Sequence, residues 1–178
     1  MTDSPRFIAD AMLGSLARKL RIFGFDCRYF RHGDDQSLMA VARKDGRTIL
    51  TFDRGLAGSA DRRGIPCFLL YGTTDLQRLG SLAHLADSLS VQLRAGKTRC
   101  PLCNRVLRRT TKKKLTVRVS EGTLKRHRIF YECSHCWRAF WKGRHWTRLR
   151  KLSRAVDGKK NLTHTRSNGS DVAHRPAR

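Results

Sequence analysis

Short apolar runs alternate with stretches of helical spacing over the first 90 residues. Four runs have the length of buried strands, at residues 7–9, 27–30, 48–51 and 65–70. Apolar residues at intervals of three and four predict helices at 12–23, 35–46 and 76–89, and 54–64 predicts a loop or short helix. Strands that alternate with helices predict an α/β fold, in which helices flank a parallel sheet.

Aspartates stand where three of the predicted strands end. They are Asp10 after the first run, Asp34 and Asp35 after the second, and Asp53 after the third. Ligands bind beyond the carboxyl ends of parallel strands, and carboxylates there bind magnesium or manganese, which can activate water for phosphodiester cleavage. We therefore predict a catalytic metal site at Asp10, Asp35 and Asp53. The alternative for each residue alone is a helix cap or a turn, and Asp10 and Asp35 both suit an N-cap.

Positive charge is concentrated in the second half of the chain. The protein has 178 residues, a formal net charge of +24 and a pI near 11.2. Residues 1–93 carry 13 basic and 10 acidic side chains, whereas residues 94–178 carry 25 and 4. This surplus indicates a polyanionic partner, and nucleic acid is favoured over a membrane surface because no basic amphipathic helix stands out. No apolar run approaches 18 residues, so we expect no membrane-spanning helix.

Two CxxC pairs lie in the basic half, Cys100 with Cys103 and Cys133 with Cys136. Such pairs place four thiolates around one tetrahedral zinc ion, and four thiolates leave no open position for catalysis. The spacing predicts a structural zinc site, with two redox-active pairs as the alternative. Paired cysteines without a secretory signal also indicate a reducing compartment, so we expect a cytoplasmic protein.

The change of character along the chain predicts three units. We expect a nuclease domain at 1–93, a zinc ribbon at 94–152 and a basic disordered tail at 153–178. Within the ribbon, strands are predicted at 115–119 and 129–131.

Basic and aromatic side chains are interleaved around the predicted ribbon. The candidates for binding nucleic-acid phosphates there include Lys112, Lys113, Lys114 and Arg144. The aromatic side chains are Trp137, Phe140, Trp141 and Trp146. They either stack on bases or form the small apolar core of the ribbon.

Four segments together resemble the PIN-like ribonuclease family named after the C-terminal domain of the Mut-seven exonuclease. In chain order they are FIADAMLGSLARKLRIFGFDCRYF, DDQSLMAVARKDGRTILTFDRGL, RCPLCN and YECSHCWRAFWKGRHWTRL, within about residues 6–150. The resemblance implies a PIN-like α/β domain, a C-terminal zinc ribbon and metal-dependent cleavage of RNA.

The resemblance also implies roles for single residues. The implied acids are Asp10, Asp35 and Asp53, and the implied zinc ligands are Cys100, Cys103, Cys133 and Cys136. Asp34 could take the place of Asp35. Arg18 and Arg21 match basic positions that would contact phosphate. Phe52 departs from the pattern, because members of the family often have Arg before this Asp.

The leading hypothesis is a divalent-metal-dependent ribonuclease that holds RNA on its basic zinc ribbon. The ribosome and tRNA are further candidate partners. One alternative is a non-catalytic RNA-binding or ribosome-associated protein whose first half is only a scaffold, and another is a toxin-like nuclease controlled by a partner protein.

Overall fold

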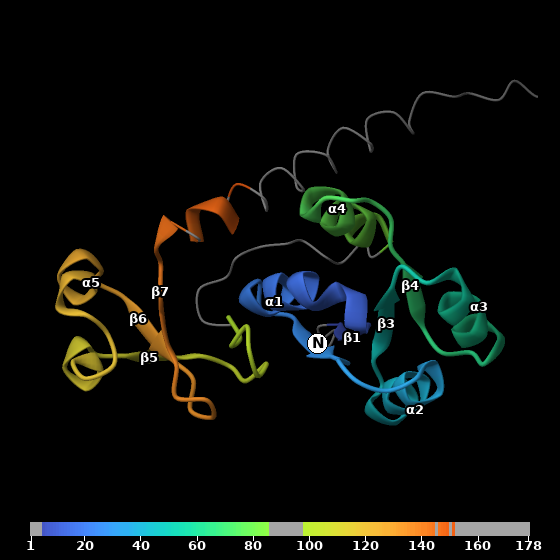
Figure 1. Ribbon diagram of the computed structural model, residues 1–178, viewed down its shortest axis with the longest axis horizontal. Coiled ribbons are helices and arrows are strands. Elements are labelled where there is room, and N and C mark those ends of the chain that lie inside the picture. The colour runs from blue at the N-terminus through green and yellow to red at the C-terminus, as the bar shows by residue number, and fades with distance from the viewer. Residues whose placement is uncertain (1–4, 86–97, 145, 150, 152–178) are drawn as a thin grey trace, which may run out of the picture.

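The computed structural model describes residues 5–85, 98–144, 146–149 and 151. It contains one parallel and one antiparallel sheet. Figure 1 shows the parallel sheet with its helices at one end of the molecule and the antiparallel sheet at the other. The second part is called the cysteine module here and consists of the described residues between 98 and 149.

Four parallel strands form the first sheet, in the order β2-β1-β3-β4. They are β1 (Arg6–Ala9), β2 (Asp26–Tyr29), β3 (Thr48–Thr51) and β4 (Cys67–Leu69). The register pairs Ala9 with both Tyr29 and Leu50, so β1, β2 and β3 end at the same edge. The predicted α/β fold is therefore confirmed, with β4 shorter than the apolar run at 65–70.

Helices connect the strands and cover both faces of the sheet. They are η1 (Ala11–Leu13), α1 (Gly14–Ile22), α2 (Asp35–Asp45), α3 (Arg54–Arg62) and α4 (Asp75–Leu85). Of the two alternatives for 54–64, the chain forms a helix. The end of the helix predicted at 76–89 lies outside the described residues.

Side-chain alternation along β1 assigns the helices to their faces. Phe7 and Ala9 pack with residues of α1 and α4, whereas Ile8 packs with residues of α2 and α3. All three strand residues are completely buried. Successive strand residues point to opposite faces, so a strand covered on both sides needs a continuous apolar run.

The cysteine module is built from short elements around a central strand. They are β5 (Arg108–Thr110), η2 (Lys112–Leu115), α5 (Glu121–Arg126), β6 (Phe130–Glu132) and β7 (Ala139–Trp141). β6 lies between β5 and β7 in an antiparallel sheet. The strand predicted at 129–131 corresponds to β6. The tail predicted at 153–178 lies outside the described residues.

The strand predicted at 115–119 is wrong. Leu115 and Val119 are buried, whereas Val117 between them is 97% exposed. The N–H of Val119 donates to the carbonyl oxygen of Leu115 (2.9 Å), which is the spacing of a helical turn. The segment resembled a strand because Leu115, Val117 and Val119 stand at every second position. Only Leu115 and Val119 are buried in the core.

A buried arginine joins the two parts of the molecule. Arg21 of α1 is only 5% exposed. Its Nε donates to the carbonyl oxygen of Cys27 (2.7 Å), and its Nη1 donates to those of Pro101 (2.8 Å) and Leu102 (3.0 Å). One guanidinium therefore satisfies carbonyl groups of β2 and of the first CxxC turn at once.

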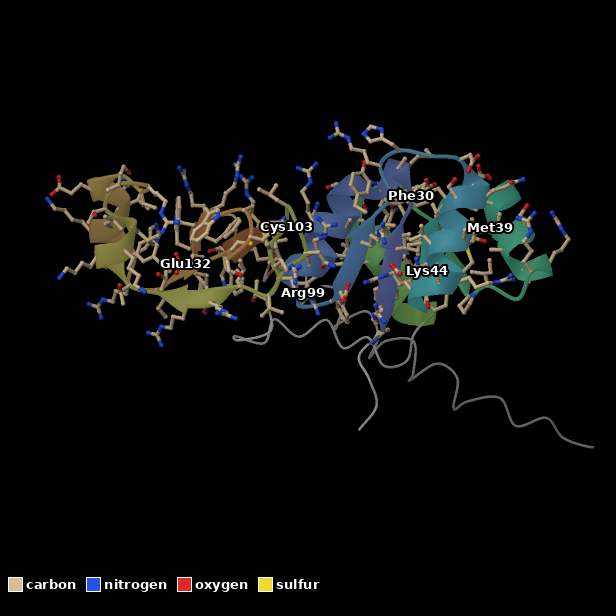
Figure 2. All side chains as sticks on the ribbon, turned by 90° about the horizontal axis from the view of Figure 1, so that it is seen from below. Phe30, Met39, Lys44, Arg99, Cys103 and Glu132 are labelled. Carbon is tan, nitrogen blue, oxygen red and sulfur yellow. The ribbon has the colours of Figure 1, made fainter. Side chains whose placement is uncertain are left out.

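A second set of polar contacts reinforces this junction. The side-chain amide of Asn104 donates to Asp26 Oδ1 (2.7 Å) and accepts from the N–H of Cys27 (3.2 Å) on edge strand β2. Arg47 also donates to Asp26 Oδ1 (2.6 Å). Burial alone would raise the pKa of Asp26, but the hydrogen bonds from Arg47 and Asn104 outweigh it and lower that pKa. Figure 2 shows Arg99, whose guanidinium also pairs with Asp26, and Cys103 between the two parts.

The chain then returns to the first core. Residues 146–149 are helical, and Leu149 is 4% exposed in the cluster that contains Phe7, Leu16 and Leu79. The cysteine module thus contacts the parallel-sheet part at both of its ends, through its first CxxC turn and through Leu149.

We expect Arg21→Met to lower the free energy of unfolding by roughly 3–5 kcal/mol, because three carbonyl groups lose a charged donor in a buried place. Urea unfolding followed by circular dichroism measures the change. Arg18→Met removes an exposed arginine from the same helix and should stay within about 0.5 kcal/mol of wild type. Equal stability of the Arg21→Met protein and wild type would contradict the proposed junction.

Candidate functional site

Two of the predicted acids lie on neighbouring strand ends of the parallel sheet. Asp10 follows β1 and Asp53 follows β3, and the N–H of Asp10 continues the ladder by donating to the carbonyl oxygen of Leu50 (3.0 Å). The strand order changes direction between β1 and β3, which is where ligands of such sheets bind. The fold therefore brings these two carboxylates to the position that the sequence predicted.

Thr51 links the two acids. Its hydroxyl donates to Asp10 Oδ2 (2.9 Å) and accepts from the N–H of Asp53 (3.0 Å), and the residue is completely buried. One hydroxyl thus fixes the orientation of Asp10 relative to the end of β3. The sequence analysis missed this residue. The available signal was a hydroxyl two residues before the acid, in a strand that is otherwise apolar at its centre.

The third predicted acid begins α2. Asp34 caps this helix by accepting from the N–H of Ser37 (2.8 Å), and Asp35 is its first residue, so the predicted N-cap was one residue too late. Gly33 before them has φ of 125°, and an added Cβ would lie 2.7 Å from the ring of Phe30. Glycine alone fits this turn without strain. Figure 2 shows Phe30 at this edge of the sheet and Lys44 toward the other end of α2.

The carboxylates at this edge influence one another. Asp35 is exposed, and slight desolvation followed by the charges of Asp53, Asp10 and Asp34 raises the pKa of its carboxyl group. The backbone hydrogen bond from Ser37, in contrast, lowers the pKa of Asp34. Like charges repel, and a bound cation would relieve the repulsion. The edge thus has the electrostatic character of a cation site.

The same acids also cap helices, as the alternative interpretation predicted. Asp53 Oδ1 accepts from the N–H groups of Gly55 (2.6 Å) and Leu56 (3.1 Å), and Asp10 Oδ1 accepts from that of Ala11. In the described part of the chain, the oxygens of these acids do not form a group of three that is close enough to hold a metal ion directly. Magnesium usually takes only one or two carboxylates directly and keeps several waters. The oxygen donors therefore fit such an ion by chemistry, partly through water.

The four predicted zinc ligands do come together. Cys100 Sγ lies 3.5 Å from Cys136 Sγ, and Cys103 Sγ lies 3.3 Å from Cys133 Sγ. All four sulfurs lie within 4.8 Å of one another. Zinc–sulfur bonds of about 2.3 Å in a tetrahedron place the sulfurs roughly 3.8 Å apart. The cluster could therefore hold a structural metal ion such as zinc.

The two CxxC turns share one backbone geometry. The residue after each second cysteine has a positive φ, 68° at Asn104 and 58° at Trp137. Its N–H donates to the carbonyl oxygen of the first cysteine in the turn, at 2.9 Å from Cys100 and 3.0 Å from Cys133. Side chains other than glycine rarely adopt this backbone conformation. Its repetition at both turns indicates that sulfur placement dictates the local backbone.

The sulfurs differ in acidity. Burial raises the pKa of the Cys100 thiol to about 12. Burial would also raise the pKa of Cys133, but backbone hydrogen bonds from Cys136 and His135 outweigh it and lower that pKa to about 7. Donors aimed at a sulfur favour its thiolate form, which is the form that binds metal.

The residues predicted to contact phosphate differ in their exposure: Arg21 is buried, and the others are exposed. Arg21 is buried and its donors are occupied by carbonyl groups, so the predicted phosphate contact is corrected to a structural role. Arg18 is exposed on α1. The remaining predicted residues are also exposed and are Lys112, Lys113, Lys114 and Arg144. The lysines lie on η2, away from the junction with α1.

The protein thus combines a parallel α/β sheet, with acids at its switch point, and a four-cysteine module. A family model described as Mut7-C RNAse domain matches residues 5–153, so the chain belongs to this family and the resemblance seen in the sequence is confirmed. A search of curated proteins and a search of solved structures gave no match. Over the described residues, no helix has both the length and the apolar character needed to cross a membrane.

We expect purified protein to contain about one zinc ion per chain and to lose the fold of the cysteine module on chelation, because metal binding supplies much of the folding energy of so small a unit. Elemental analysis and amide NMR spectra measure both. Cys136→Ser should reduce the zinc content, whereas Cys67→Ser, outside the cluster, should not. A metal-free module with unchanged amide spectra would contradict the assignment.

Proposed function

We propose that this protein is a divalent-metal-dependent ribonuclease. Asp10, Asp35 and Asp53 would hold magnesium or manganese at the carboxyl edge of the parallel sheet. A zinc ribbon ligated by the four cysteines would hold the RNA, together with the exposed cations of α1 and the cysteine module. We further propose a cytoplasmic protein whose partner is RNA, with the ribosome and tRNA as candidate partners.

The observation that carries this proposal is the placement of two acids at the ends of adjacent parallel strands. Asp10 follows β1 and Asp53 follows β3, and the Thr51 hydroxyl donates to Asp10 and accepts from the N–H of Asp53. Helix capping explains each of these two acids singly but does not explain the contact that joins them. Membership of the Mut7-C RNAse domain family supports RNA phosphodiester cleavage as the chemistry.

The chain's own residues have definable tasks in this reaction. Thr51 would hold Asp10 in one orientation through its hydroxyl hydrogen bond. Asp53 would use Oδ1 for capping α3 and keep its other oxygen for a cation. Arg18, exposed on α1, would neutralise a substrate phosphate. A divalent cation bound at this edge supplies water activation and stabilisation of charge on the phosphate.

A second candidate function is an RNA-binding scaffold without turnover. The observation in its favour is that Asp10 accepts hydrogen bonds at both carboxyl oxygens and that the acids of the described chain are spread more widely than one inner coordination sphere. This function predicts RNA affinity that is unchanged when the acids are removed.

We expect Asp53→Asn to reduce RNA cleavage at least about hundredfold while the fold is retained, because asparagine caps a helix as well as aspartate does but lacks the charge. The measurement is cleavage of mixed single-stranded and structured RNA, with magnesium, with manganese and without either. Zinc content is checked in each sample, so that loss of the structural metal is not mistaken for loss of catalysis.

Asp61→Asn is the matched control, because Asp61 is an exposed acid of the same helix α3. It should cleave as wild type does. Full activity of Asp53→Asn would remove Asp53 from the site. RNA binding without cleavage by wild type under every condition would favour the scaffold.

We also expect Thr51→Val to lower cleavage without loss of RNA affinity. Valine keeps the volume of this buried position but removes the hydroxyl that orients Asp10. The rate at saturating RNA and the affinity are measured separately on the same preparation. Unchanged cleavage at saturation would show that the hydrogen bond does not position the acid.

A further inference from the structure

A groove lies between α1 and the cysteine module. Its cavity volume is about 720 Å³. One wall is a face of α1 formed by Ser15, Arg18, Lys19 and Ile22. The opposite wall comes from Tyr131 of β6, from β7 and from the segment after β7. The first CxxC turn lies between the two walls. These elements can be followed in Figure 1.

The walls of the groove carry positive charge, and one of their cations, Arg99, pairs with Asp26 outside the groove. The cationic lining residues are Arg18, Lys19, Arg99, Arg138, Lys142 and Arg144. Four of them are exposed, on both sides of the groove: Arg18, Arg138, Lys142 and Arg144. None of the lining residues that the structure describes is acidic. Such a charge distribution selects a polyanion.

The groove also contains aromatic rings. Trp141 and Trp146 line it, Trp141 is 39% exposed, and Lys142 Nζ lies 5.1 Å above the ring of Trp146. The sequence left open whether the four aromatic side chains of this region stack on bases or form a core, and the structure places them differently. Phe140 packs against the cysteine cluster and also lines the groove, whereas Trp137 is 68% exposed outside the groove. Aromatic faces flanked by cations are typical of surfaces on which unpaired bases stack.

We infer that this groove binds single-stranded RNA, with phosphates on the exposed cations and bases against Trp141 and Trp146. The inference rests on the proposed function for the choice of RNA. The size favours a single strand, because the volume matches pockets of about 300–1,000 Å³ that enclose small ligands. A duplex keeps its bases stacked and paired, so it could contact only the rim, whereas unstacked bases enter such a cavity.

The groove leads toward the acids. Its wall on α1 begins at Ser15, and the preceding turn η1 starts directly after Asp10. An RNA strand that follows α1 from its last turn toward its first would therefore approach the carboxyl edge of the sheet. The groove would hold the part of the strand next to the scissile bond, and the cysteine module would have a direct role in the placement of substrate.

The test measures binding separately from cleavage. Asp10→Asn/Asp53→Asn protein is titrated with a fluorescent 12-nucleotide unstructured RNA and with a duplex of the same sequence, at several salt concentrations. In this background we expect Arg18→Ala/Arg144→Ala to flatten the salt dependence for the single strand by roughly 1.4 in slope, since each lost phosphate contact contributes about 0.7. The control Lys44→Ala/Arg62→Ala removes two exposed cations from α2 and α3 and should leave the slope unchanged.

Trp146→Ala should weaken single-strand binding about five- to one-hundredfold, and Trp146→Phe should restore much of it, because stacking needs a ring rather than an indole. Zinc content and thermal unfolding show whether each variant keeps its fold. The two arginines are exposed, so the charge variant tests the groove even if the tryptophan variant unfolds. Photocrosslinking to RNA should label peptides from 15–22 and 138–146.

Several outcomes would overturn the groove. The first is equal RNA affinity of the groove variants and the control variants, and the second is duplex binding as tight as single-strand binding. The third is RNA crosslinks only to η2. The fourth is that another segment of the chain or a protein partner covers the groove. Cleavage by wild type with unaffected groove variants would refute the groove and keep the nuclease. Groove-dependent binding without cleavage by wild type would refute the nuclease and keep the groove.

Discussion

The hydrogen bonds of Arg21 fix the arrangement on which the rest of the molecule depends. One buried guanidinium binds a carbonyl group of edge strand β2 and two of the first CxxC turn. Burial lowers the pKa of Arg21, yet arginine stays charged at any pH that a protein tolerates. Carbonyl groups of a tight turn are difficult to satisfy when buried, so a permanent donor is well suited to this place. The orientation of the cysteine module relative to α1 follows from this contact, and so does the groove between them.

The acidic edge shows how one side chain serves folding and chemistry together. Asp53 and Asp34 cap α3 and α2, so the helix N-termini place positive partial charge beside the carboxylates. At Asp34 the backbone hydrogen bond from Ser37 lowers the pKa of the carboxyl group and so favours its ionised form. Capping also fixes their rotamers before any ligand arrives, which reduces the ordering required of a metal site. The structural and functional interpretations of these aspartates are therefore compatible, and a capped carboxylate still has a second oxygen to offer.

A metal in the cysteine module would affect the acidic edge only indirectly. The first CxxC turn both supplies sulfurs and receives the Arg21 and Asn104 contacts, so any ion that rigidifies this turn also rigidifies the junction. A metal bound here would therefore stabilise the contact between the cysteine module and α1, the helix that follows Asp10 and η1. If the proposed groove binds RNA, the basic module would help to place the substrate as well as raise RNA affinity.

The sequence by itself determined the parallel α/β fold, the cysteine cluster and the acids at the strand ends. Each of these follows from local periodicity or from a fixed short spacing, and both can be recognised in the sequence without knowledge of distant contacts. It did not determine that 115–119 is a turn, because the same alternation of apolar residues suits a strand or one helical turn. It also could not show that Arg18 is exposed while Arg21, three residues later on the same helix, is buried. Only the tertiary structure decided this, since burial of a charge depends on which distant carbonyl groups the fold brings to it.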